Sequence, residues 1–252
     1  MTELNEIVEF LNNYLEIDSF RDPSFNGLQF EGSSKINKIL FAVDSGLMAF
    51  EKAVEEEADM IVVHHGIFWN GSNPSIRGIM KKRLKILFEN DISLYAAHLP
   101  LDKHKDSGNN AELAKLIGAR ITDEFMEIEG TKIGYIGELN EPKKVNELAK
   151  LLEKSLNTTA KVLENRSKKV ANVAICSGGG GQKAFREAAE KKVDLYITGE
   201  ETDIYNDAYD SGINVIFAGH HATETVGVKA LAQILENKFS VKTKFVDIPT
   251  QL

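Results

Sequence analysis

Four of the six histidines in this 252-residue chain occur as two adjacent pairs. Random placement of six histidines gives roughly 0.1 such pairs, so the pairing indicates a shared role. His64 and His65 end one predicted strand, and the second pair begins with His220 at the end of another. Asp102 follows a third predicted strand, and Glu224 lies four residues after His220. Clustered imidazoles and carboxylates are typical ligands of divalent transition metals.

The first histidine pair stands at the end of an apolar run. Neighbours in an extended strand point to opposite faces, so His64 and His65 share one site only where the strand gives way at Gly66. Alternatively, each imidazole binds a different ion of a close pair. Both arrangements remain open from the sequence.

The later motifs show how a carboxylate and an imidazole reach one site. His220 follows Gly219 and starts a predicted helix, so Glu224 lies on the same face about one turn away. Pro100 is expected to stop any helix and to hold the chain extended, so that Asp102 returns to the end of its strand.

The ligand set restricts the metal and the chemistry. Cys176 is the only cysteine, which excludes an internal disulfide and a thiolate-rich zinc or iron–sulfur site. Zinc, iron, manganese, cobalt and nickel all accept imidazoles and carboxylates. Three imidazoles and two carboxylates are too many for one tetrahedral ion that keeps a water position, and they fit two ions. Such a pair lowers the pKa of a bridging water towards neutrality, which predicts metal-assisted hydrolysis.

Short β-rich runs alternate with amphipathic helical segments over most of the chain, which is typical of α/β folds with a largely parallel sheet. Ligands of open α/β sheets bind outside the carboxyl ends of the strands, where the candidate metal ligands stand. The predicted strands are Asn37–Asp44, Asp59–His65, Ile92–His98, Thr131–Gly137, Thr159–Glu164, Val170–Ser177, Val193–Gly199, Ile213–Gly219 and Ser240–Ile248.

A seam rich in acidic residues at Thr122–Gly130 separates two stretches that each resemble a series of strands and helices. We therefore predict two α/β halves. Residues 1–126 form the first half, with the His-His and HLPLD motifs. Residues 127–252 form the second, whose C-terminal part returns to a shared metal cleft.

The net charge of −8 and the pI of about 5.4 argue against an open basic face for nucleic acid. Nucleic-acid binding through a channel stays open if Lys81 and Lys82, in a basic stretch, line it. The sequence lacks an 18-residue apolar run and a secretory signal, so we predict a cytoplasmic protein without membrane contact.

Further residues near the motifs have two interpretations each. The glycine-rich run Ser177–Gly181 precedes a predicted helix and either holds a phosphate or makes a tight turn. Phe68 and Trp69 either stack on a base or pack at the domain interface. His98 is either a partner that orients the metal ligands or shuttles protons, or a structural residue.

Together these motifs resemble the GTP cyclohydrolase 1 type 2 homologue family, the NGG1-interacting-factor-three-like proteins. The resemblance covers most of the chain and rests on PSFNGLQFEG, FAVD, VVHHGIFW, AAHLPLD, SGNNAELA, SGGGG, LYITGE and AGHHATE. It implies two intertwined and structurally similar α/β domains with layered sheets flanked by helices. It also implies a two-metal centre in the cleft between them and a ring-shaped homohexamer.

When the family's metal ligands are carried over to the matching motifs, the resemblance implies the ligands His64, His65, Asp102, His220 and Glu224. His221 is adjacent to His220 but is not implied as a ligand. Family members often have Pro where this chain has Gly66 and Thr where it has Leu99, which affects loop shape more than metal binding.

The function expected is a dinuclear metal-dependent hydrolase, with GTP ring opening as the candidate reaction on a nucleotide-like small molecule. The alternative is a non-catalytic, ring-forming protein that handles metal ions or regulates by binding.

Overall fold

The computed structural model describes residues 1–166 and 169–250. Within these ranges the chain is a mixed α/β protein of two compact units, which confirms the predicted fold class. Unit 1 contains Met1–Leu101 and Val228–Ile248, and unit 2 contains Asp102–Gly227 and the end of the described chain from Pro249. The chain thus leaves unit 1, builds unit 2 and returns to unit 1.

The division between the units differs from the boundary expected at residues 126 and 127. The chain passes from one unit to the other inside two helices, α4 (Leu99–Lys103) and α9 (His220–Lys238). Residues 126 and 127 lie instead within the strand β7 (Ala119–Ile128). The acidic seam resembled a linker because this strand lies at the edge of its sheet, where its charged side chains face water.

Unit 1 contains a five-stranded sheet with the order β13-β4-β5-β6-β2. Its four neighbouring strands from β13 to β6 pair in parallel, and β2 adds an antiparallel edge. The strands are β2 (Gly27–Phe30), β4 (Lys38–Asp44), β5 (Met60–His65), β6 (Ser93–Ala96) and β13 (Lys242–Phe245), and β1 (Thr2–Glu3) pairs separately with β3 (Lys35–Ile36).

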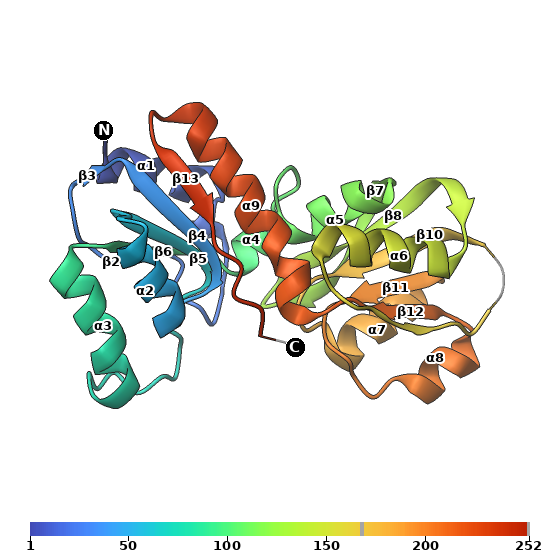
Figure 1. The fold of residues 1–252 in the computed structure, drawn as a ribbon. Coiled ribbons are helices and arrows are strands. Elements are labelled where there is room, and N and C mark those ends of the chain that lie inside the picture. The colour runs from blue at the N-terminus through green and yellow to red at the C-terminus, as the bar shows by residue number, and fades with distance from the viewer. Residues whose placement is uncertain (167–168, 251–252) are drawn as a thin grey trace. The chain divides into compact units, whose positions relative to one another are not determined.

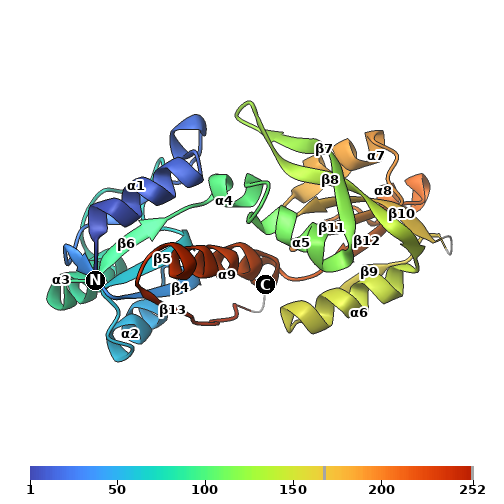
Figure 2. The same cartoon turned by 90° about the horizontal axis from the view of Figure 1, so that it is seen from above.

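Helices cover both faces of this sheet, because successive residues of its central strands point to opposite faces and are apolar on both. Along β4, Ile39, Phe41 and Val43 pack with α1 (Leu4–Tyr14) and the C-terminal part of α9, as Figure 1 and Figure 2 show. Leu40 and Ala42 pack on the opposite face. That face is covered by α2 (Leu47–Glu55) and α3 (Gly78–Asn90).

An ion-pair cluster around Glu56 gives unit 1 a predicted acid sensitivity. Its carboxylate accepts hydrogen bonds from Lys244 at 2.6 Å and Lys38 at 2.8 Å, which lower its pKa from 4.5 to about 2. A carboxylate with a lowered folded-state pKa stabilises the fold above its unfolded pKa and loses this effect as pH falls towards its folded pKa. We therefore expect Glu56→Gln to lower the Tm at neutral pH. The difference from the parent should shrink between about pH 4.5 and pH 2.

Thermal unfolding followed by circular dichroism measures this effect. Glu89→Gln is the matched control, since Glu89 is exposed and contacts Lys85 at 3.5 Å on the surface of α3. A constant Tm difference for Glu56→Gln across this pH range would contradict the prediction.

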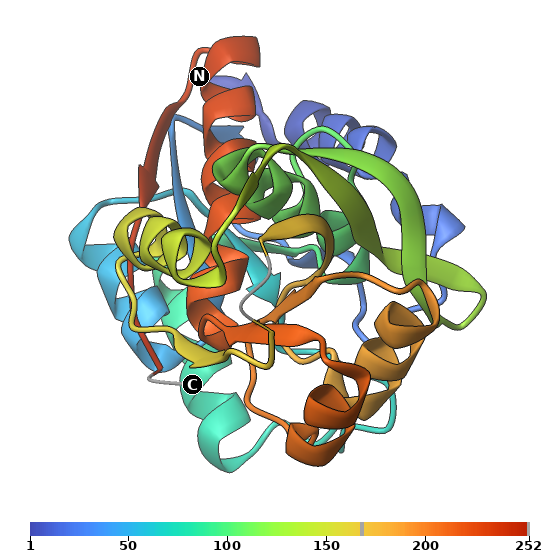
Figure 3. The same cartoon turned by 90° about the vertical axis from the view of Figure 1, so that its right-hand side faces the viewer.

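Unit 2 contains a six-stranded mixed sheet with the order β7-β8-β10-β11-β12-β9. Strands β10, β11 and β12 pair in parallel, and the outer strands pair antiparallel. Figure 3 shows the long β7–β8 ribbon at one edge. The remaining strands are β8 (Thr131–Lys143), β9 (Lys161–Leu163), β10 (Val170–Cys176), β11 (Leu195–Thr198) and β12 (Asn214–Phe217).

The unit 2 sheet also carries helices on both faces (Figure 1). Helices α5 (Asn109–Ile117) and α6 (Val145–Leu156) pack on Val173, Ile175 and Ile197. On the other face, Phe185 of α7 (Gly181–Glu190) makes an edge contact with Tyr196 of β11. Helix α8 (Tyr205–Ser211) precedes β12.

All nine predicted strands are present, although several are shorter or longer than expected. The prediction missed β2 and β7, along with the two-residue strands β1 and β3. In the part of the chain that is described, none of the helices combines the length and the apolar character needed to cross a membrane.

Candidate metal site

The first histidine pair ends β5 in unit 1. His64 is fully buried, and its Nδ1 donates a hydrogen bond to the Ala97 carbonyl at 2.8 Å. The Nδ1 of His65 donates to the Asp44 carboxylate at 2.8 Å, because β4 and β5 pair in parallel with Asp44 opposite His65. The two ring centroids are 4.5 Å apart. Each imidazole is thus held through Nδ1 by an oxygen acceptor, as is usual for metal-bound histidines.

His98 joins this pair within unit 1. Its ring centroid is 5.2 Å from that of His64 and 5.6 Å from that of His65. Its Nδ1 donates to the Asp22 carboxylate at 2.8 Å. Burial raises the pKa of Asp22, but hydrogen bonds from His98, Asn26 and the Ser24 amide, with the charge of His98, lower it overall. Asp22 is therefore a buried anion that fixes the orientation of His98.

Asp102 is buried in unit 2, and the prediction of an extended segment before it was wrong. Leu99–Lys103 forms the short helix α4, because Pro100 lies in the first turn, where its missing N–H is tolerated. The Oδ1 of Asp102 accepts hydrogen bonds at 2.8 Å from Asn109 and from the hydroxyl of Ser177. These two donors fix the carboxylate.

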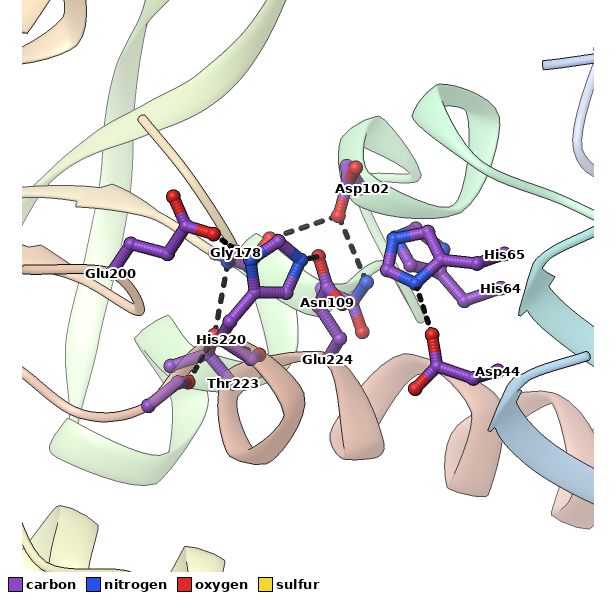
Figure 4. A network of polar contacts seen from close by, with 12 residues as sticks. Asp44, His64, His65, Asp102, Asn109, Gly178, Glu200, His220, Thr223 and Glu224 are labelled. Atoms are coloured by element: carbon purple, nitrogen blue, oxygen red, sulfur yellow. Dashed lines mark hydrogen bonds and ion pairs between the residues drawn. The ribbon is translucent and has the colours of Figure 1, made fainter. Parts of the chain in front are cut away.

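His220 and Glu224 lie one turn apart at the start of α9, as their spacing predicts. The Nε2 of His220 is 3.1 Å from the Glu224 carboxylate, and its Nδ1 is 2.7 Å from that of Glu200 (Figure 4). Burial lowers the pKa of His220, but the hydrogen bonds and charges of Glu224 and Glu200 outweigh it and raise that pKa to about 9. Without a metal, the imidazole is therefore a cation at neutral pH.

The predicted ligands thus come together in two sets. In unit 1, one nitrogen each from His64, His65 and His98 lie within 4.8 Å of one another. In unit 2, carboxylate oxygens of Asp102 and Glu224 lie within 4.8 Å, and His220 contacts Glu224. His221, placed outside the ligand set, is buried.

The glycine-rich run acts mainly as a close-packed turn beside the unit 2 set. The Gly178 amide donates to the Thr223 hydroxyl at 2.9 Å, and the Ser177 amide donates to Asn110 at 2.7 Å. A Cβ on Gly178 would lie 2.2 Å from Glu224 Oε1, and Gly178 has a φ of +59°. These contacts favour the tight-turn interpretation over phosphate binding, since two amides of the run already donate within the protein.

Gly178→Ala tests whether this close approach positions Glu224. We expect it to displace the carboxylate and to weaken divalent-metal binding by about tenfold or more. Gly181→Ala is the control, because Gly181 has a similar φ of +61° but nothing within 4 Å of its Cβ position. Both variants carry a backbone cost of about 1 kcal/mol, so their Tm values should fall by a few degrees. Equal metal affinity of the two variants, measured by calorimetric titration, would contradict the prediction.

The other residues noted in the sequence have partly structural roles. The indole N–H of Trp69 donates to the Gly66 carbonyl at 2.8 Å, and its ring meets His98 edge-on at 5.0 Å. Cys176 is buried, and burial raises the pKa of its thiol. Lys81 and Lys82 are exposed on α3.

Sequence analysis missed several residues that orient the ligands, above all Asp22, Asn109 and Thr223. Asp22 is 76 positions from His98 in the chain, so no local spacing connects them. The only available signal was the polar cluster around Pro23, where Asp22 accepts hydrogen bonds from the Ser24 amide and the Asn26 side chain.

Comparisons with known proteins find similar sequences over nearly the whole length of this chain. The family model of Duf34/NIF3 (NGG1p interacting factor 3) matches residues 2–251. A curated protein of Pyrococcus horikoshii named GTP cyclohydrolase 1 type 2 homolog is 48% identical over 250 residues, covering 98% of this chain and 99% of that protein.

Solved structures show the same fold. Protein ybgI, described as of unknown function, has a TM-score of 0.93 at 38% identity, and all of both chains is covered. Reduced HcgD from Methanocaldococcus jannaschii has a TM-score of 0.83 at 28% identity, with 98% of each chain covered. The family model matches nearly the whole sequence, and these relatives agree with it. The chain therefore belongs to the Duf34/NIF3 family.

Proposed function

We propose that the chain is a metal-dependent hydrolase that binds two divalent metal ions and acts on a nucleotide-like small molecule. The ligands of the proposal are His64, His65, Asp102, His220 and Glu224. The observation that carries it is the orientation of these side chains. Each imidazole is held through Nδ1 by an oxygen acceptor, and Asp102 is held by two donors.

The residues present fit such ions. His64 is fully buried, and Asp102 and Glu224 are only 5% and 3% exposed. Burying carboxylates and imidazoles together is costly unless cations or hydrogen bonds compensate for lost hydration. Nitrogen and oxygen donors without a thiolate suit zinc, iron, manganese, cobalt or nickel.

The chain's own residues orient the ligands and hold protons. Asp44 accepts the Nδ1 proton of His65, and Glu200 accepts that of His220. Each Nε2 therefore points away from the carboxylate that accepts the Nδ1 proton of the same ring. Asn109 and Ser177 donate to one oxygen of Asp102 and thereby fix the orientation of the carboxylate. Two bound divalent ions would supply a water of lowered pKa and polarise the bond attacked.

GTP is the candidate substrate because curated relatives carry the name GTP cyclohydrolase 1 type 2 homolog. Hydrolysis of the C8–N9 bond would open the imidazole ring and leave a formyl group on N7, and hydrolysis of the C8–N7 bond by a second water would release formate. The test is formate release from GTP by the full chain loaded with Zn²⁺, Mn²⁺, Fe²⁺, Co²⁺ or Ni²⁺. We expect turnover that disappears in His64→Ala and Glu224→Gln and persists in Glu236→Gln, an exposed position of the same helix α9.

The same experiment separates the alternative function. Full metal occupancy without turnover of GTP, other nucleotides or phosphoesters would contradict hydrolysis and favour a protein that handles metal ions. Turnover that survives in His64→Ala and Glu224→Gln would contradict the proposed ligands.

We also propose self-association as a homohexamer ring, which follows from the family resemblance. Light scattering should give a mass of six times 28.0 kDa. A monomeric mass at micromolar concentration would contradict the ring.

A further inference from the structure

We propose that the α3 surface of one copy of the chain binds the α8 surface of a second copy. This inference deepens the proposed self-association, on which it rests, because it names the two surfaces that meet. The α3 surface comprises Ile79, Lys81, Lys82, Lys85 and Phe88. The α8 surface comprises Asp203, just before the helix, and Tyr205, Asp207, Tyr209 and Asp210 within it.

The α3 surface combines basic and apolar side chains. The opposite side of the helix packs in the core of unit 1. Ile79 and Phe88 are 65% and 68% exposed. Lys81 and Lys82 are exposed as well, and among the described residues no carboxylate forms an ion pair with either. Large apolar side chains gathered on an exposed face mark a surface that a partner covers.

The α8 surface combines acidic and aromatic side chains. Tyr205 and Tyr209 lie one helical turn apart and are 40% and 73% exposed. Asp203, Asp207 and Asp210 are exposed on the same helix and at its start. Tyrosine is enriched at the centres of protein–protein interfaces, because its ring buries apolar area while its hydroxyl can still form a hydrogen bond.

The two surfaces carry opposite charges, which identifies the partner. Residues 76–90 contain five basic side chains and one acidic side chain, whereas residues 201–211 contain four acidic side chains and no basic one. Complementary charges steer association, and like charges placed together reject a wrong partner. Two α3 surfaces, or two α8 surfaces, would therefore repel each other. The contact must join unlike surfaces head to tail, and repeated contacts of this type can close into a ring.

Nucleic acid is the competing occupant of the α3 surface. It would pair with Lys81 and Lys82, but it would leave Ile79 and Phe88 without an apolar partner. It would also leave the tyrosines and carboxylates of the α8 surface unexplained. A second copy of the chain accounts for both surfaces.

The test measures the mass of the full chain by light scattering over a range of concentrations. Lys81→Glu/Lys82→Glu reverses the charge of the α3 surface, and Asp207→Lys/Asp210→Lys reverses that of the α8 surface. We expect each variant alone to raise the dissociation constant of the assembly about a hundredfold or more, because like charges then face each other.

An equimolar mixture of the two variants is the decisive measurement. The introduced glutamates of one variant then face the introduced lysines of the other, and the unchanged surfaces meet at the alternate contacts. We expect the mixture to recover the parent's mass, although neither variant does so alone. A folding defect would persist in the mixture, so this recovery separates a lost contact from misfolding.

A further variant and a control complete the set. Ile79→Asn should raise the dissociation constant about tenfold or more, since it removes an apolar side chain from the contact. Its Tm in the dissociated state should stay within a few degrees of the parent's, because Ile79 is exposed. Lys150→Glu/Lys154→Glu is the control, since it reverses two exposed lysines of α6 and should keep the parent's mass.

The outcomes distinguish this inference from the proposed ring. A hexamer that keeps its mass in both charge-reversed variants would overturn the inference and leave the self-association intact. An assembly of another size that dissociates in each variant and re-forms in the mixture would support the inference and contradict the ring of six. A parent that stays monomeric at every concentration would contradict both. An α3 variant that keeps the parent's mass but no longer binds single-stranded RNA would overturn the inference in favour of nucleic acid.

Discussion

Glu224→Gln is expected to reduce metal binding from two ions per chain to one or none at micromolar metal. The carboxylate is 3% exposed, contacts His220 at 3.1 Å and lies within 4.8 Å of Asp102. Replacing a buried anionic ligand with a neutral amide removes both the charge and a donor oxygen. The expected loss is at least a hundredfold in affinity, above the tenfold to hundredfold caused by residues that only support ligands.

Elemental analysis after dialysis and calorimetric titration measure this loss. Glu236→Gln is the matched control, since Glu236 is an exposed residue of the same helix. We expect the control to retain both ions. Two ions bound at unchanged affinity in Glu224→Gln would refute the assignment of this residue as a ligand.

Metal affinity is expected to rise by about fiftyfold between pH 7 and pH 9 for the ion that binds His220. The neighbouring carboxylates raise the pKa of this imidazole to about 9, so below that pH a metal must displace its Nε2 proton. Displacing one proton costs about tenfold in affinity for each pH unit below the pKa. Metal affinity rises with pH because the carboxylates that stabilise the imidazolium also oppose its deprotonation.

Competition with a chelator of known affinity, corrected for its own protonation, measures the dependence. His220→Gln should bind this ion more weakly at pH 9 and should lose most of the slope. The prediction fails if the parent shows no slope in this range, or if His220→Gln keeps the same slope as the parent.

The central strands could be predicted because their pattern is unambiguous. In β4 the residues on both faces are apolar and buried, from Ile39 to Val43, which is typical of a parallel strand covered by helices on both sides. Strand β7 was missed for the opposite reason. It buries Phe125 and Met126 between exposed acidic residues, so its composition resembles that of a linker.

The ligand candidates were identified from local spacing, whereas their supports were not. His220 and Glu224 lie one helical turn apart, and the helix begins where Gly219 predicts. The partner of His98 is Asp22, on a distant irregular segment, and only the fold brings the two together. Pro100 shows a further limit, since the same residue that stops a helix also begins one.

The most direct test of the central claim is anomalous scattering from a crystal of the full chain loaded with Zn²⁺ or Mn²⁺. The account predicts two anomalous peaks per chain whose protein ligands include His64, His65, Asp102, His220 and Glu224. A structure in which none of these five side chains binds a metal ion would contradict it.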